Sequence, residues 1–172
     1  MNRYQLAKIV QWAGTLRSRK RMQKMIFLLK AAGCPLDADY DLHHYGPYSQ
    51  DVARLTDEMV REKLLCETTE ARHYGEQYSY VLSDEASRQI SAYESSSRSA
   101  GPAKEMAAFE SLARKLEQTD LKELEVASTI VFFRKQGDDW IDAVEKTRQF
   151  KNLLADTPFL EKCKAIASEI VA

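Results

Sequence analysis

The chain has 172 residues, of which 44% are hydrophobic and 30% charged, as in ordinary globular proteins with one core or two small packed domains. Its longest apolar run, Met25–Leu29, is far shorter than the roughly 20 residues that cross a bilayer, which excludes a membrane-spanning helix. No basic segment leads into an apolar core at the start of the chain, so we expect no secretion signal and a cytoplasmic location.

The net charge of −1 conceals an uneven distribution of charge along the chain. Residues 1–36 hold eight basic residues and no Asp or Glu, so the rest of the chain carries a net charge of −9. A basic end on an acidic body suggests a surface that faces a polyanion or an acidic partner. The basic residues that lie closest together in this stretch are Arg17, Arg19, Lys20, Arg21 and Lys24.

The cysteines and histidines do not have the spacing of a metal site. Cys34, Cys66 and Cys163 are far apart and form no CxxC pair, which indicates reduced thiols packed as small hydrophobic side chains. His43 and His44 are adjacent on a predicted strand, where neighbouring side chains point to opposite faces and cannot chelate one ion. We therefore expect no metal and no cofactor.

Hydrophobic periodicity and capping residues predict the elements of the first half. In chain order they are helices over 3–13 and 20–32, a short strand over 40–45, a helix over 50–62 capped by Ser49, strands over 65–70 and 77–82 joined by a turn at 71–76, and a helix capped by Ser83. This order is that of a winged helix-turn-helix with a small β-hairpin wing. We expect such a domain over residues 1–94.

The second half is entirely helical in pattern. Residues 95–102 are polar and rich in helix breakers, which predicts a linker or loop. Beyond it, residues 103–172 have one apolar stripe from Met106 to Leu116, a helix capped by Asp120, a helix from Trp140 and a last helix from Pro158. The expected fold is mainly α (α+β), with this helical segment packed against the first domain or forming a homodimer beside it.

Several segments of the chain resemble those of a known family. Residues 20–29, KRMQKMIFLL, resemble the "KLQKLLYLL" helix of the YwgA-like proteins and of the related Panacea (SocA-like antitoxin) domains. The five residues before the helix at 50–62 are similar to the YGPYS signature of that family. They are Tyr45, Gly46, Pro47, Tyr48 and Ser49. Residues 82–86 look like the "LTEEG" that follows many wings, although Ala86 stands where Gly is common, and 124–137 are similar to the helical region that follows in YwgA-like chains.

The resemblance implies a winged-helix fold more directly than a function. Panacea domains occur as antitoxins beside diverse toxins and as phage- or mobile-element-associated proteins, so a partner protein, such as a toxin, is expected. No nucleophile elbow, Walker loop, HExxH motif or Rossmann glycine triplet is present in the sequence, so we predict that the chain is not an enzyme.

DNA binding is the alternative prediction. The helix at 50–62 would enter the major groove, where Gln50 and Arg54 are suited to reading base edges. This helix carries four carboxylates and two arginines, so its net negative charge would repel the phosphates of DNA. Sequence-specific DNA binding through this helix is therefore less favoured than the fold alone would suggest. The basic cluster from Arg17 to Lys24 would contact a phosphate backbone or an acidic partner, or would pair with the acidic second half of the chain. The function predicted first is regulation through protein–protein binding, as an antitoxin-like or adaptor module.

Overall fold

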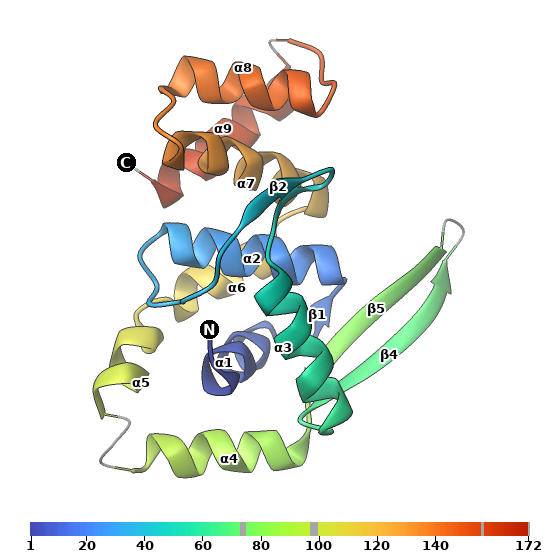
Figure 1. The fold of residues 1–172 in the computed structure, drawn as a ribbon, viewed down its shortest axis with the longest axis vertical. Helices are drawn as coiled ribbons and strands as arrows, with labels where there is room; N and C mark the ends of the chain where they lie inside the picture. The colour runs from blue at the N-terminus through green and yellow to red at the C-terminus, as the bar shows by residue number, and fades with distance from the viewer. Residues whose placement is uncertain (73–74, 97–99, 156, 172) are drawn as a thin grey trace.

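The computed structural model describes residues 1–72, 75–96, 100–155 and 157–171, which form a mostly helical molecule with two small antiparallel sheets (Figure 1). In chain order the elements are α1 (Arg3–Ala13), β1 (Leu16–Arg17), α2 (Arg19–Ala31), β2 (Asp41–His43), β3 (Gly46–Tyr48), α3 (Gln50–Arg61), β4 (Leu65–Arg72), β5 (Gly75–Leu82), α4 (Asp84–Glu94), α5 (Ala100–Ala107), α6 (Glu110–Gln118), α7 (Leu121–Lys135), α8 (Trp140–Phe150) and α9 (Pro158–Ile170). None of the helices in this described part has the length and apolarity needed to cross a bilayer.

Capping residues set the helix ends that the sequence predicts. The hydroxyl of Ser49 accepts a hydrogen bond from the backbone of α3, and that of Ser83 does the same for α4. The Asp120 carboxylate accepts two backbone N–H groups of α7. Such caps replace hydrogen bonds that the first turn of a helix lacks, each worth about 1 kcal/mol. The predicted starts of these helices are confirmed.

The first sheet is built on the β4–β5 hairpin, whose register runs from Leu65 opposite Leu82 to Arg72 opposite Gly75. Both strands are longer than predicted: β4 ends two residues later, at Arg72, and β5 begins two residues earlier, at Gly75. The turn predicted at 71–76 is shorter by these four residues, and residues 73–74 lie outside the described part. The connection predicted between the first two helices contains β1, where Leu16 pairs with Tyr80 on the free edge of β5. The hairpin projects from the body of the molecule (Figure 1).

The second sheet differs from the prediction of one strand at 40–45. It is a hairpin in which β2 pairs with β3, with Leu42 opposite Pro47 and His43 opposite Gly46. Gly46 turns the chain with a φ of 91°, a conformation that residues with a Cβ rarely adopt. The YGPYS motif therefore supplies the end of the hairpin turn with Tyr45, the second strand with residues 46–48, and the cap of α3 with Ser49.

Helix α2 lies at the centre of the molecule (Figure 1). Its eight consecutive residues from Met22 to Leu29 are all buried, and it packs against α6, α7 and β3. A surface helix would bury one stripe only, so burial on all sides identifies α2 as a core helix. One continuous cluster of buried residues joins this helix to α1 and to the C-terminal helices.

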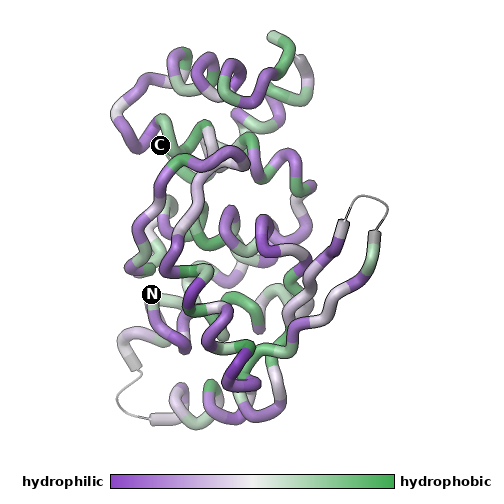
Figure 2. The backbone as a smooth tube through the Cα atoms, turned by 45° about the vertical axis from the view of Figure 1, so that its right-hand side comes forward, coloured by the Kyte–Doolittle hydropathy of each residue, from purple (hydrophilic) through white to green (hydrophobic). Residues whose placement is uncertain are grey.

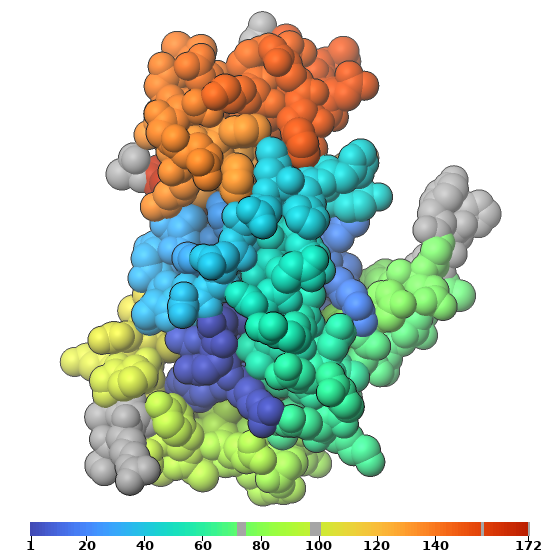
Figure 3. Space-filling view, in the orientation of Figure 1, coloured from blue at the N-terminus to red at the C-terminus, as the bar shows by residue number. Residues whose placement is uncertain are grey.

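The second half contacts the first through α6 and α7. α6 packs on α1 and α2, and α7 packs on α2 and β3. Figure 3 shows the cyan β2–β3 hairpin against the orange helices of the C-terminal segment. Helix α5 begins at Ala100, inside the stretch 95–102 that is predicted to be a linker, while residues 97–99 lie outside the described part. The single apolar stripe predicted over 106–116 belongs to two helices, α5 and α6, because the chain bends at 108–109.

The prediction for the cysteines is correct for two of the three. Cys34 and Cys163 are buried, and burial raises the pKa of the Cys34 thiol to about 11 and that of Cys163 to about 12. Cys66 is exposed on β4, so the expectation that it packs as a buried hydrophobic side chain is wrong. Alternation along a strand places its side chain on the solvent side of the hairpin.

Candidate functional site

The residues of the YGPYS motif are held in place by two buried polar side chains of α2. The Gln23 side chain accepts a hydrogen bond from the Ser49 backbone N–H (2.9 Å) and donates one to the Ser49 carbonyl (3.0 Å). Lys24 Nζ donates to the carbonyl oxygen of Pro47 (2.7 Å). Both side chains are at most 5% exposed. The two sequence motifs are therefore halves of one structural unit, and Gln23 is a residue that the sequence analysis did not single out.

Gly46 is required by a close approach of α7 to the hairpin. A Cβ at this position would lie 2.7 Å from Thr129 Oγ1, closer than real side chains approach. The Thr129 hydroxyl donates to the backbone oxygen of Glu125 (2.7 Å), which fixes its position on α7. Glycine is therefore needed at position 46 for two reasons: the turn requires a positive φ, and the close contact with α7 leaves no space for a Cβ.

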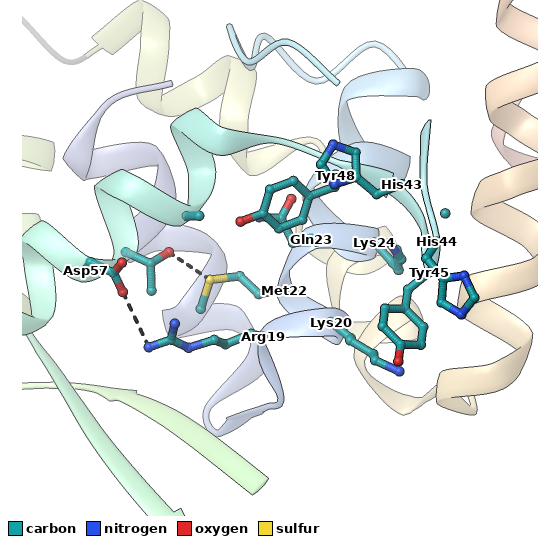
Figure 4. A pocket seen from close by; sticks show the side chains of 13 residues that line it. Arg19, Lys20, Met22, Gln23, Lys24, His43, His44, Tyr45, Tyr48 and Asp57 are labelled. Carbon is teal, nitrogen blue, oxygen red and sulfur yellow. Dashed lines mark hydrogen bonds and ion pairs between the residues drawn. The ribbon is translucent and has the colours of Figure 1, made fainter. Parts of the chain in front are cut away.

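A cavity of about 300 Å³ lies between α2, the β2–β3 hairpin and α3 (Figure 4). We call it the hairpin pocket. Side chains of two chemical kinds line it: apolar or aromatic groups, and cations. The aromatic and apolar ones include Met22, His43, Tyr45 and Tyr48, and the cations are Arg19, Lys20 and Lys24. Figure 4 shows Arg19 and Asp57 at one end of the pocket and Tyr45 with His44 at the other.

The aromatic rings of the pocket come from the β2–β3 hairpin. The His43 ring stacks on Tyr48, with centroids 4.8 Å apart and planes inclined by 27°. Tyr45 stands at the rim with 51% of its surface exposed, and Lys20 Nζ lies 3.6 Å from the centre of its ring. A cation over an aromatic face at this distance is attracted by the electron-rich ring. The rim therefore presents an apolar surface with a fixed positive charge.

Three lysines surround one carboxylate beside the pocket. Glu125 of α7 pairs with Lys20 (3.3 Å) and with Lys151 (3.8 Å), while Lys24 also lies within its field. Burial lowers the pKa of Lys24 to about 8 and lowers that of Lys151, although the charge of Glu125 opposes both shifts. Desolvation disfavours an ammonium ion that lacks a full set of partners. The cluster of three lysines and one glutamate thus has a net charge of +2 when all four groups are ionised.

Part of the chain is similar to a known protein. No family model matches the chain. Over 82 residues it is 34% identical to the uncharacterized protein YwgA of Bacillus subtilis (strain 168). The chain is YwgA-like over this stretch. The alignment covers 48% of this chain and spans about half of YwgA, at 49% of its length. The similarity to YwgA does not indicate an activity. The relation to Panacea antitoxins stays a prediction.

The basic cluster of the sequence does not form one surface. Successive residues of a helix point about 100° apart, so Lys20 and Lys24, four residues apart, share the face toward the pocket. Arg21 points to α6, where its Nη1 donates to the carbonyls of Leu116 (3.2 Å), Glu117 (2.6 Å) and Thr119 (2.7 Å). Arg21 thereby satisfies carbonyl groups at the C-terminal end of α6.

The remaining two cations of that cluster lie near the β4–β5 hairpin. Arg19 donates to the Tyr80 hydroxyl (2.8 Å) and pairs with Glu67 (3.1 Å) and, at 3.4 Å, with Asp57. Tyr80 is fully buried and donates in turn to Glu67, so this network fastens the hairpin to α2. Arg17 is exposed on β1, and no ion pair to it is found within the described residues.

The two predicted base-reading residues are exposed on α3 in acidic surroundings. Arg54 pairs with Asp51 (2.8 Å) on its own helix. It also lies in an open depression of about 560 Å³ that Asp37, Asp39 and Glu58 help to line. Gln50 is the first residue of α3. The carboxylates around Arg54 would repel the phosphate groups of a duplex.

Proposed function

We propose that this chain is a non-enzymatic interaction protein built on a winged helix-turn-helix, and that it binds a partner protein at the hairpin pocket. The order α1, β1, α2, α3, β4, β5 supports the winged-helix assignment, because β1 lies between the first two helices and pairs with the strand that closes the projecting hairpin. The β4–β5 hairpin would be the wing. The insertion of β2 and β3 between α2 and α3 is the feature that creates the pocket.

The observation that carries the proposal is the chemistry of the hairpin pocket. Its volume of about 300 Å³ is at the lower end of the range of about 300–1,000 Å³ typical of ligand sites. Tyrosine, methionine and arginine are the side chains that protein interfaces favour, and all three types line it. Tyr45 is more than half exposed although it is large and aromatic, so it is available to a partner. An antitoxin-like role, with a toxin as partner, is the specific form that the motif resemblance favours.

Site-specific crosslinking tests this proposal. A photo-reactive phenylalanine analogue at position 45 is expected to give one discrete adduct in cells that express the chain at its natural level. The same analogue at position 93, on α4, is the control, because Tyr93 is also an exposed tyrosine, with 36% of its surface accessible. The adduct is identified by mass spectrometry, and the purified partner is then titrated into the unmodified chain. Absence of an adduct at position 45, or equal adducts at both positions, contradicts the proposal.

DNA binding remains the second candidate because Gln50 and Arg54 are exposed at the start of α3, where a winged helix reads bases. Electrostatics opposes it. Residues 50–62 carry four carboxylates and two arginines, and residues 65–82 carry three glutamates and one arginine. Figure 2 shows the β4–β5 hairpin coloured hydrophilic or neutral over most of its length. Both elements that would approach the duplex are thus net negative, while phosphate attraction supplies most of the affinity of such proteins.

A salt titration with random-sequence duplex DNA separates the two candidates. We expect no binding at physiological salt. Binding whose affinity falls steeply with salt, and which is lost when Arg54 is changed to Ala, would favour the DNA-binding function over the first proposal, because each phosphate contact contributes to the slope.

A further inference from the structure

Among the described residues, the positive charge beside the hairpin pocket exceeds the negative charge. Glu125 is the carboxylate that pairs with Lys20 and Lys151, and its charge also acts on Lys24. The other carboxylate of the pocket, Asp57, pairs with Arg19 at the opposite end. One carboxylate, that of Glu125, therefore interacts with three ammonium groups. Lys24 and Lys151 are largely buried, and buried charges are normally paired, so a further anion near these lysines would complete the cluster.

Lys24 is the least satisfied member of this cluster. An ammonium group has three N–H donors, and within the described residues Lys24 donates one hydrogen bond, to the Pro47 carbonyl. The residue is only 2% exposed, so water reaches the other donors poorly. Its side chain is one of those that line the hairpin pocket, so a buried cation lies beside this cavity.

Lys20 stands at the rim of the same cavity, one helical turn before Lys24. Its side chain is 42% exposed and lies over the ring of Tyr45. An anionic group in the pocket would lie near Lys20 and Lys24, while groups beside it contact Tyr45 and Tyr48. The two cations and the two aromatic rings belong to the lining of one cavity (Figure 4).

We infer that the hairpin pocket receives a carboxylate side chain from an acidic segment of the partner protein, held between Lys20 and Lys24, with a neighbouring apolar side chain against Tyr45 and Tyr48. This inference rests on the proposed function, that the chain binds a partner protein there. It specifies the chemistry of the partner: a glutamate or aspartate flanked by hydrophobic residues.

A carboxylate fits this pocket better than a phosphate group does. Bidentate recognition of phosphate uses the guanidinium of arginine, and other phosphate sites use lysine together with a set of backbone N–H groups. The arginine of this pocket, Arg19, is already engaged by Glu67 and Asp57. Glu125 and Asp57 would also repel a dianion more strongly than a monoanion. The small volume and the aromatic walls suit side chains of a peptide.

The test is a titration of the purified full chain with model peptides, followed by the backbone amide signals of nuclear magnetic resonance spectra. The first probe is an acetylated and amidated pentapeptide with a central glutamate between two leucines. The second replaces that glutamate by glutamine, and the third is inorganic phosphate. We expect saturable shifts with the glutamate peptide in α2 and in the β2–β3 hairpin, and binding at least about tenfold weaker with the glutamine peptide.

Variants of the two lysines locate the contact. Lys20→Met and Lys24→Met are each expected to weaken binding of the glutamate peptide at least about tenfold, because each removes a charged hydrogen-bond donor. Lys135→Met is the matched control: this exposed lysine ends α7, about 15 Å along the helix from Glu125, and should leave binding unchanged. Since Lys20 is partly exposed, its variant keeps the test valid if Lys24→Met does not fold.

Three results would overturn the inference: equal affinity for both peptides, saturable binding of phosphate without binding of the glutamate peptide, or unchanged affinity in Lys20→Met. These results are independent of the crosslinking experiment, which needs no peptide. A partner that crosslinks at position 45 but binds Lys20→Met as tightly as the natural chain overturns this inference and leaves the proposed function intact. Absence of any partner contradicts the proposed function directly.

Discussion

Replacing Lys24 by methionine should change how the stability of the protein depends on pH. Burial lowers the pKa of Lys24 from 10.5 to about 8 in the folded chain. Between these two values the unfolded chain holds a proton on this side chain that the folded chain has released. Stability therefore rises with pH across this window, whereas below about pH 8 the full cost of burying the ammonium ion is present.

The size of the expected change in stability follows from the shift in the pKa of Lys24. Each pH unit of difference in pKa is worth about 1.4 kcal/mol, so lowering the pKa from 10.5 to about 8 corresponds to about 3 kcal/mol. Methionine has a similar shape and no charge, but it leaves the Pro47 carbonyl without its donor, at a cost of about 1–3 kcal/mol. At pH 7 we expect Lys24→Met to be as stable as the natural chain or more stable.

The assay is urea denaturation of both proteins at several pH values from 7 to 10.5. The stability of the natural chain minus that of Lys24→Met should increase by about 3 kcal/mol over this range. Taking the difference removes the contributions of other groups that titrate there, such as Cys34, whose pKa is raised by burial. Lys135→Met, which removes an exposed lysine, serves as the control for the loss of one positive charge. A difference for Lys24→Met that stays constant within about 0.5 kcal/mol would refute the reasoning.

Two further predictions concern stability and are measured by chemical denaturation. Gly46→Ala should destabilise the protein by about 1–3 kcal/mol more than Gly137→Ala does. Both glycines have positive φ, but the new methyl group clashes with Thr129 only at position 46. Equal losses of stability would show that the contact with α7 is unimportant. Arg21→Ala should cost about 1–3 kcal/mol by leaving the end of α6 without its donor, whereas Arg17→Ala, on the exposed β1, should change stability by less than about 0.5 kcal/mol.

Local signals made most helices predictable. The ends of α1, α3, α4 and α7 depend on residues within one turn, such as the glycine at position 14 and the capping side chains of Ser49, Ser83 and Asp120. Their capping hydrogen bonds form between neighbours in the chain, so they are visible in the sequence.

The sequence does not predict strands that are defined by pairing with residues elsewhere in the fold. β1 has two residues and is a strand only because Leu16 pairs with Tyr80, far away in the chain. A proline at position 47 reads as a chain break, yet Pro47 pairs with Leu42 in β3. Neither alternation nor propensity identifies a strand this short, because the hydrogen bonds that define it cross the fold.

The candidate site was predictable in its parts but not in its assembly. The sequence marks Lys20, Lys24 and the residues from Tyr45 to Ser49, and the structure brings them around one pocket. It does not mark Gln23, because a buried glutamine has no sequence signal until its backbone partner is known. A row of cations in the sequence also suggests one charged surface, whereas the Arg21 side chain reaches backbone carbonyls at the end of α6 and that of Lys24 reaches the Pro47 carbonyl.

Burial of α2 on all sides has a consequence for how this chain can be divided. Its apolar surface is covered partly by α6 and α7, which belong to the second half of the sequence. A fragment that stops after α4 would leave that surface in water, and a fragment that starts at α5 would lack the helix it packs around. Two such fragments, produced separately, should be insoluble or unfolded alone and should recover the native structure when mixed.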